Sequence, residues 1–308
     1  MWDVSHAQTL VSIVVSTYNR SNVLYYALES VLRQTFKDWE LLVVGDACTD
    51  DTDLLMHSFV ERDKRIRYQN REFNYGEQSG PNNDGVAESS GRYVAFLNHD
   101  DIWLEDHLEV LVGAIRERGC DMVFSLVDYL QPDHVSRIVG ATPSGEYDPL
   151  LFVPASSWLV KRETLEDVGP WRPARQLYNI PSQDWCFRAW KLGKKIEMVA
   201  NLSVVAMPSG LRKNVYSNRE CDVNERYFTA SGDMSAFRQR ELTNAIVEHS
   251  EQWLKRYPAG MLIKWGIINT VRRLLFFIGL HPEAVKNFIF HPGKGGFIAS
   301  LHKVRGIS

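Results

Sequence analysis

Two adjacent carboxylates, Asp100 and Asp101, follow directly on an apolar segment at residues 93–97. Carboxylate oxygens in such a position suit a hard divalent cation, which takes oxygen ligands and commonly bridges substrate phosphates. A structural role competes with this interpretation, because either aspartate can cap the helix that the pattern predicts from about Trp103. We predict a site for Mn²⁺ or Mg²⁺ at Asp100 and Asp101, with helix capping as the alternative.

Three other side chains are typical of a site for a nucleotide and a hydroxyl substrate. Asp46 follows the apolar segment 39–44 and can accept a hydrogen bond from a nucleobase N–H or a ribose hydroxyl. Tyr18 offers a flat face for a base, and Asp184 can act as a general base toward a hydroxyl. Each residue also has a structural alternative. Asp46 could be a turn aspartate, Tyr18 a half-buried aromatic residue of a loop, and Asp184 an acidic residue in the first turn of a helix.

Apolar strands and amphipathic helices alternate along the first 130 residues. The pattern predicts strands at 11–15, 39–44, 66–68, 93–97 and 122–130, with helices between them. Continuous apolar strands of this kind indicate an α/β fold with a mostly parallel sheet covered on both faces. Ligands of such sheets bind beyond the carboxyl ends of the strands. The polar clusters 17–20 and 98–101 and Asp46 all follow strands, so we expect them to converge on one crevice.

The pattern is looser after about residue 140. It predicts a helix over 182–192 and a polar loop over 212–235. No stretch of about 18 uncharged apolar residues predicts a helix that spans a membrane. Four widely spaced cysteines give no zinc or disulfide framework, and the first residues lack the pattern of a signal peptide, so we expect a cytoplasmic protein.

Charge is divided unevenly along the chain, although the net charge is only −3. Nine Lys and Arg residues and one acidic residue, Glu283, lie in 252–308, whereas the rest of the chain is acidic. Residues 261–280 form a helical pattern with one apolar arc. This segment either packs on the catalytic domain with a solvated basic edge or binds an anionic membrane surface as an interfacial helix. No nucleic-acid partner is expected.

Several motifs taken together resemble the family 2 glycosyltransferases. They are VSIVVSTYNR at 11–20, SVLRQTFKDWELLVVGD at 30–46, TDDT at 49–52, NYG at 74–76 and GRYVAFLNHDD at 91–101. The resemblance is dense over 10–115, weaker through 169–192 and loose afterwards. It implies a GT-A fold with a C-terminal helical extension, and an inverting transfer of a sugar from a nucleotide-diphosphate donor. By family habit the donor is a UDP-sugar, and the acceptor is a saccharide or lipid-linked hydroxyl in bacterial surface polysaccharide synthesis.

The resemblance also implies roles for individual residues. Asp100 would bind the metal with Asp101 beside it, and Asp184 would be the catalytic base. Nucleotide binding would involve the segment after the first strand, Asp46, and residues near the metal: Ser16, Thr17, Tyr18, Arg20, Asp46, Asn82, Asn98 and Asp100. The acceptor is expected to lie against aromatic side chains and the loop 212–235: Trp158, Trp171 and Trp185.

This sequence departs from the family pattern at three positions. Asn98 stands where the first aspartate of the metal motif is usual, Gln183 stands before the base in place of Glu, and Asn82 stands where Arg is common. These departures keep a non-catalytic sugar-nucleotide-binding protein open as an alternative. A nucleotidyltransferase for sugar phosphates is the other alternative, although the loop at 16–20 lacks the glycines usual in such enzymes. We expect a catalytic domain at 1–210, a loop or helical connection at 211–257, and a basic amphipathic segment at 258–308. This last segment either packs on the domain or seats the protein on the inner face of the membrane.

Overall fold

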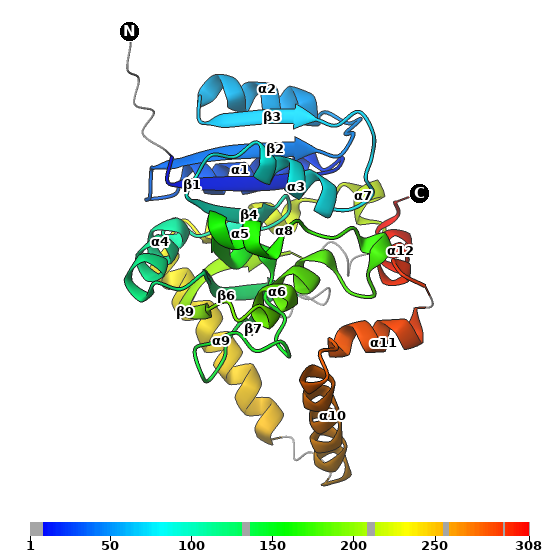
Figure 1. Cartoon of the computed structure of the whole chain (residues 1–308). Coiled ribbons are helices and arrows are strands. Elements are labelled where there is room, and N and C mark those ends of the chain that lie inside the picture. The colour runs from blue at the N-terminus through cyan, green and yellow to red at the C-terminus, as the bar shows by residue number, and fades with distance from the viewer. Residues whose placement is uncertain (1–8, 131–135, 208–212, 255–258, 292, 308) are drawn as a thin grey trace.

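The computed structural model describes residues 9–130, 136–207, 213–254, 259–291 and 293–307. A central sheet runs through the molecule with helices on both faces (Figure 1). Its strands are β1 (Val11–Thr17), β2 (Trp39–Gly45), β3 (Ile66–Asn70), β4 (Tyr93–Asn98), β5 (Ile102–Trp103), β6 (Met122–Leu130), β7 (Ser136–Val139), β8 (Trp158–Lys161) and β9 (Ile196–Ala206). The strand order is β3-β2-β1-β4-β8-β6-β9-β5, with β7 paired to β6.

The part of the sheet formed by β3, β2, β1 and β4 is parallel, as the sequence predicts. Thr17 at the end of β1 pairs with Gly45, and Ser16 pairs with Asn98. The register therefore places the ends of β1, β2 and β4 side by side. Beyond β4 the sheet is mixed, because β8 runs antiparallel to both β4 and β6 while β9 runs parallel to β6.

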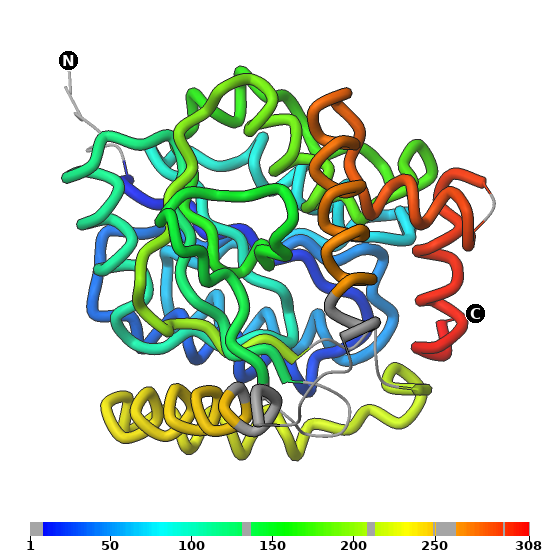
Figure 2. Tube along the Cα trace, turned by 90° about the horizontal axis from the view of Figure 1, so that it is seen from below, coloured from blue at the N-terminus to red at the C-terminus, as the bar shows by residue number. Residues whose placement is uncertain are grey.

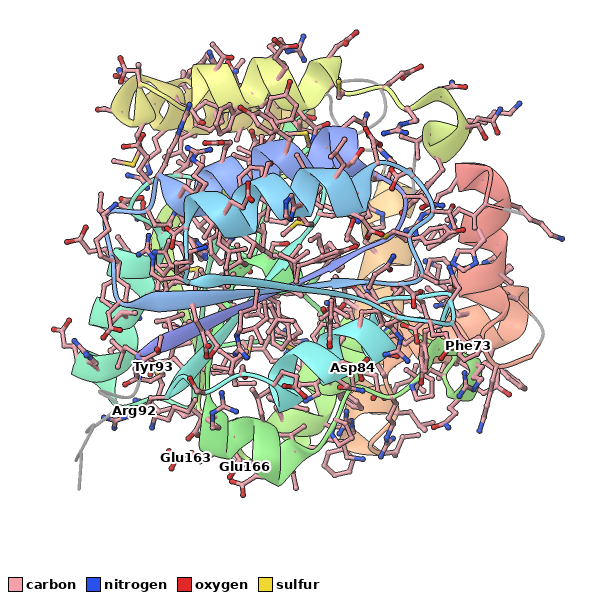
Figure 3. The ribbon with its side chains drawn as sticks, turned by 90° about the horizontal axis from the view of Figure 1, so that it is seen from above. Phe73, Asp84, Arg92, Tyr93, Glu163 and Glu166 are labelled. Carbon is pink, nitrogen blue, oxygen red and sulfur yellow. The ribbon has the colours of Figure 1, made fainter. Side chains whose placement is uncertain are left out.

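Helices cover both faces of the sheet, which Figure 3 shows from above. The helices α1 (Ser21–Leu32) and α2 (Thr52–Arg62) lie on one face, and α3 (Ser79–Ala87) and α5 (Arg162–Val168) lie on the other. Close packing of α3 depends on Gly85, since a Cβ atom there would lie 2.5 Å from Cγ1 of Val14 on β1. The helix that the sequence predicts from about Trp103 is α4 (His107–Arg118).

The segment predicted as a polar loop is instead helical. Residues 213–235 contain α7 (Val215–Asn218), α8 (Asp222–Ala230) and the start of α9 (Met234–Leu254), whereas Arg212 lies outside the described residues. The apolar anchors are few but well buried: Tyr227 and Phe228 pack with Ile102, Leu130 and Phe237. The prediction was wrong because a short helix with two buried aromatic residues has little apolar periodicity.

The C-terminal part of the chain forms α10 (Ala259–Phe277), α11 (Pro282–Phe290) and α12 (Gly296–Arg305). Figure 1 shows α11 and α12 on the side of the domain to which β2 and β3 point, with α10 below them, and Figure 2 shows the same helices from below. The exposed fraction of the side chain is high along α10 and at its end, with 60% for Ile267, 60% for Leu274 and 91% for Phe277. A search of the described residues found no helix that is both long and apolar enough to span a membrane.

Candidate functional site

A cavity of about 560 Å³ opens at the carboxyl ends of the parallel strands. One side of it is formed by residues that follow β1, β2 and β4: Ser16, Thr17, Tyr18, Asp46, Asn98, His99, Asp100 and Asp101. The segment before and at the start of α6 (Pro181–Lys191) adds residues 179–183. The cavity is closed on its other side by the C-terminal helices. These contribute Arg272, His281, Glu283, Lys286, Asn287, Phe297, Ile298, Leu301, His302 and Arg305.

Two loops that follow β1 and β2 fix the first part of the site. The Oδ1 atom of Asn19 accepts a hydrogen bond from the backbone N–H of Thr49 at 2.7 Å, which ties the loops together. Asp46 accepts hydrogen bonds from the backbone N–H groups of Tyr75 (2.7 Å) and Gly76 (3.0 Å). Burial raises the pKa of Asp46 above its usual value, in spite of these two bonds and the positive charge of Arg71. Its carboxylate thus holds the loop 71–78 and still faces the cavity.

Tyr18 lines the cavity next to a second aromatic ring, that of Tyr216 on α7, with 6.1 Å between the ring centroids. Both residues come from segments that are polar in sequence, and both belong to the cavity wall. A planar heterocycle bound between β1 and β2 would therefore meet aromatic surface as well as the carboxylate of Asp46.

Asp101 is held by three donors. Its carboxylate accepts hydrogen bonds from Nδ2 of Asn98 (2.8 Å), Oγ of Ser156 (2.5 Å) and the backbone N–H of Met207 (2.9 Å). Burial, followed by the negative charge of Asp100, raises the pKa of Asp101 to about 7. Asp101 therefore joins β4, β9 and the turn before β8, so that both of its oxygens are already engaged.

The residues present fit a divalent ion only in part. Asp100 lines the cavity beside Asp101, but no group of three or more His, Cys, Asp and Glu side chains in the described ranges is arranged to hold a metal ion. His99 adds no positive charge at neutral pH, because burial lowers its pKa to about 4 and outweighs the effect of Asp100. The donor set thus matches an ion held by one or two carboxylates together with substrate phosphates, as is common for Mg²⁺.

Three of the residues predicted to bind the nucleotide or to act as the base do not line the cavity. Arg20 is buried beneath the ring of Tyr216, with 5.3 Å from its guanidinium carbon to the ring centroid. Asn82 is buried on α3, with an exposed fraction of 3%. Asp184 lies in the first turn of α6 and accepts a hydrogen bond from Nε of Arg188 at 3.0 Å. The neighbouring residue Gln183 lines the cavity in its place and donates to the carbonyl oxygen of Val153.

The three tryptophans predicted to contact an acceptor belong to the core, so this prediction was wrong. Trp158 and Trp185 have exposed fractions of 0%, and Trp171 of 2%. The ring centroids of Trp158 lie 5.8 Å from those of both Trp171 and Trp185. An aromatic residue that is enclosed by other aromatic residues contributes packing and has no surface to offer a saccharide.

Sequence reasoning missed the cavity residues that come from distant parts of the chain. Ser156 precedes β8, Tyr129 ends β6, and the residues of α11 and α12 lie more than 180 positions after the metal-binding candidates. None of these carries a local motif. The excess of basic residues at 252–308 was the one sign in the sequence that this segment has a role. It did not indicate that the segment lines a cavity.

Comparison with known proteins adds independent information. Residues 12–163 match the model of a family described as glycosyl transferase family 2. An uncharacterized glycosyltransferase of Rickettsia bellii is 34% identical over 142 residues, which cover 46% of this chain and 20% of that protein. The Escherichia coli UDP-Glc:alpha-D-GlcNAc-diphosphoundecaprenol beta-1,3-glucosyltransferase WfgD is 30% identical over 142 residues, which cover 46% of this chain and 55% of WfgD. The chain therefore spans between a fifth and about half of the length of these relatives.

Solved structures resemble the fold over a longer range. Residues 1–349 of Staphylococcus aureus TarS superpose with a TM-score of 0.57 at 18% sequence identity, covering 96% of this chain and 90% of the TarS chain. A complex of the same TarS fragment with UDP-GlcNAc has a TM-score of 0.54 at 21% identity, and covers 64% of this chain and 58% of the TarS chain. At such identities the likeness concerns the fold, including the GT-A type of sheet and its flanking helices.

Proposed function

The chain belongs to glycosyl transferase family 2 through residues 12–163, and we propose that it moves a sugar from a nucleoside-diphosphate donor to a hydroxyl of a saccharide or lipid-linked acceptor. The observation that carries the proposal is the single cavity into which the ends of β1, β2 and β4 project Tyr18, Asp46 and Asp100. These side chains offer an aromatic face, a base or ribose acceptor and a metal-binding carboxylate within one space. Surface polysaccharide synthesis is the setting that we propose.

The donor that best suits this arrangement is a UDP-sugar. Asp46 is fixed by two backbone N–H groups and keeps lone pairs for the imide N–H of uracil. Two similar proteins support this choice, since WfgD is named for the use of UDP-Glc and TarS has been crystallised with UDP-GlcNAc. Nothing in the cavity wall identifies the sugar itself.

We propose that Mn²⁺ or Mg²⁺ assists the reaction through Asp100. Such an ion, when bound, offsets the charge that develops on the departing diphosphate. Asp101 then has a positioning role, because its three hydrogen bonds fix the end of β4 against β9 and Ser156. Asn98 supports the same arrangement by donating to Asp101, which explains how an amide replaces the usual carboxylate at that position.

Asp184 is our candidate for the base of an inverting displacement. The five residues directly before it line the cavity, so its backbone is next to the site. Its carboxylate is paired with Arg188, and deprotonation of an acceptor hydroxyl requires this side chain to turn by a change of rotamer. The attack of the acceptor oxygen on the anomeric carbon breaks the bond to the diphosphate, and the acceptor proton passes to Asp184.

We propose that the acceptor lies at a lipid surface to which α10 and α11 bind. Apolar side chains are exposed along α10 and α11, and Phe288, Ile289 and Phe290 have exposed fractions of 59%, 65% and 70%. The exposed cations Lys264 and Arg273 accompany them on α10. Apolar burial combined with basic charge favours an anionic bilayer over a protein partner. We therefore propose peripheral binding at the inner face of the membrane, next to lipid-linked acceptors of the kind named for WfgD.

Donor hydrolysis and transfer provide the test. The protein is incubated with a panel of UDP-, GDP- and dTDP-sugars, with Mn²⁺, Mg²⁺ or a chelator, and the release of nucleoside diphosphate is measured. We expect release from a UDP-sugar that depends on the divalent ion and is abolished in Asp100→Ala. If nucleotide sugars bind without any release, even with a range of polyprenyl-diphosphate sugars as acceptors, the protein is a binder and the proposed activity is rejected.

A further inference from the structure

Arg305, in the last turn of α12, is a cation of the cavity wall without an ion-pair partner among the described residues. Three Lys and Arg side chains line the cavity among the described residues. Arg272 and Lys286 each form an ion pair with Glu283 at 3.0 Å, so their charges are compensated. Arg305 forms no ion pair with any described residue, and its Nε atom is buried without a hydrogen-bond partner. A buried guanidinium N–H without an acceptor is unfavourable, and the rest of this half-buried side chain lines the cavity, where a ligand can supply acceptors.

The position of Arg305 is fixed by the packing of α12. The backbone N–H of Gly295, just before the helix, donates to the carbonyl oxygen of Leu177 at 2.8 Å. At the other end, the carbonyl oxygen of Val304 accepts from the N–H of Asn214 at 2.8 Å. Gly306 follows with φ +75°, and a Cβ atom there would lie 2.9 Å from Oγ of Ser217 on α7. The end of α12 is thus anchored on both sides.

Arg305 lines the same cavity as Asp100 and Tyr129. Burial and the negative charges of Asp101 and Asp100 raise the pKa of Tyr129, whereas the positive charge of Arg305 lowers it. Arg305 and the two carboxylates therefore act on the same side chain of the cavity wall.

From these observations we infer that Arg305 binds the diphosphate of the nucleotide donor. A guanidinium group presents its N–H donors in a planar fork that matches phosphate oxygens, and such charge-assisted bonds are stronger than neutral ones. The role rests on the proposed function and adds to it, since it makes the C-terminal helix α12 part of the donor site. The catalytic domain defined by the family match, residues 12–163, does not contain this contact.

Neutral His281 completes the wall on the side of α11. Burial lowers its pKa to about 4. Its Nδ1 atom accepts from the backbone N–H of Glu283 at 3.2 Å, so the proton of the neutral ring is on Nε2, which is buried without a partner. His281 therefore adds no charge to the cavity wall, and the charge-specific test below concerns Arg305 alone.

The test compares each nucleotide with its nucleoside. Isothermal titration calorimetry with UDP, GDP, ADP, CDP and dTDP first identifies the diphosphate that binds best, and the matching nucleoside serves as the ligand without phosphates. We expect Arg305→Ala to weaken the diphosphate roughly ten- to hundredfold and to leave the affinity for the nucleoside unchanged. Arg305→Lys keeps the charge but loses the fork, and should fall between the two. Lys303→Ala removes an exposed cation of the same helix and should have no effect.

The unfolding temperature of the ligand-free protein gives a second measurement. Because Arg305 has no ion-pair partner in the part of the chain that the structure describes, Arg305→Ala should leave this temperature unchanged or raise it, whereas a large decrease would show a structural role and overturn the inference. Equal diphosphate affinities for wild-type protein and Arg305→Ala would also overturn it, with the proposed function intact. If the wild-type protein binds none of the five diphosphates, the proposed function is rejected and the role of Arg305 with it.

Discussion

Phe277, the last residue of α10, is where we expect a single substitution to weaken membrane binding strongly. Its exposed fraction of 91% is the highest among the large apolar side chains of the described residues. Full burial of such a side chain is worth about 1.5–3 kcal/mol, and nearly all of that is still available to a bilayer. The substitution Phe277→Glu removes this gain and brings a negative charge to an anionic surface.

The expected loss follows from these two contributions. Loss of apolar burial costs about 2 kcal/mol, and a charge of the wrong sign near an anionic surface costs about 1 kcal/mol more. A total of about 3 kcal/mol corresponds to a roughly hundredfold weaker partition into vesicles. Folding should be unaffected, because substitutions of exposed side chains usually change stability by less than about 0.5 kcal/mol.

Sedimentation with lipid vesicles measures the partition. Vesicles of phosphatidylcholine are compared with vesicles that also contain phosphatidylglycerol, for the wild-type protein, Phe277→Glu and a matched control. The control is Leu54→Glu, which places the same charge on an exposed apolar position of α2 with an exposed fraction of 74%. We expect wild type and Leu54→Glu to bind the anionic vesicles alike. Equal binding by Phe277→Glu, or no binding by the wild type, would refute the membrane role of α10.

Three further predictions concern the cavity and the core. Asp184→Asn should lower turnover by roughly 10²–10⁴ without changing donor affinity, because Asp184 does not line the cavity; near-normal nucleotide release would remove this residue as the base. Asp101 has a pKa raised from 3.8 to about 7, so the folded state holds a proton that the unfolded state has lost, and stability should fall as pH rises from about 4 to 7. This fall should be smaller in Asp101→Asn when urea midpoints are compared across that range, and parallel pH profiles would contradict it. Trp158→Ala should cost about 3–5 kcal/mol of unfolding free energy, whereas a stable variant with an altered acceptor KM would restore Trp158 as an acceptor contact.

The strands that could be predicted from the sequence are those formed by one unbroken apolar segment. The segments 11–15, 39–44 and 93–97 each bury every apolar residue, and this appears in the sequence as an unbroken apolar run. Because these strands are parallel, their carboxyl ends lie at the same edge of the sheet. Asp46 and Asp100, which follow two of them, line one cavity, as expected from the sequence. The antiparallel insertion of β8 between β4 and β6 was beyond such reasoning, because its four residues depend on pairing partners distant in sequence.

The roles of aromatic residues and carboxylates could not be predicted in the same way. Trp158 and Tyr18 are both aromatic residues near polar neighbours, yet the first is enclosed by the core and the second lines the cavity. Asp100 and Asp101 are adjacent, but hydrogen bonds from three separate segments engage Asp101. These differences arise from long-range packing, for which neither residue type nor local spacing provides a signal.

The C-terminal segment shows why its two interpretations from sequence need not exclude each other. Arg272 on α10 lines the cavity and pairs with Glu283, while Ile267, Val271 and Leu274 on the same helix are exposed. One helix thus borders the cavity with its basic side and leaves apolar side chains uncovered. A lipid-linked acceptor has its reactive sugar at the bilayer surface, so an enzyme that uses it needs a cavity close to the element that meets the lipid. The arrangement of α10, α11 and α12 satisfies this requirement, because the helices that we propose to bind lipid are continuous in sequence with the helix that carries Arg305 to the donor site.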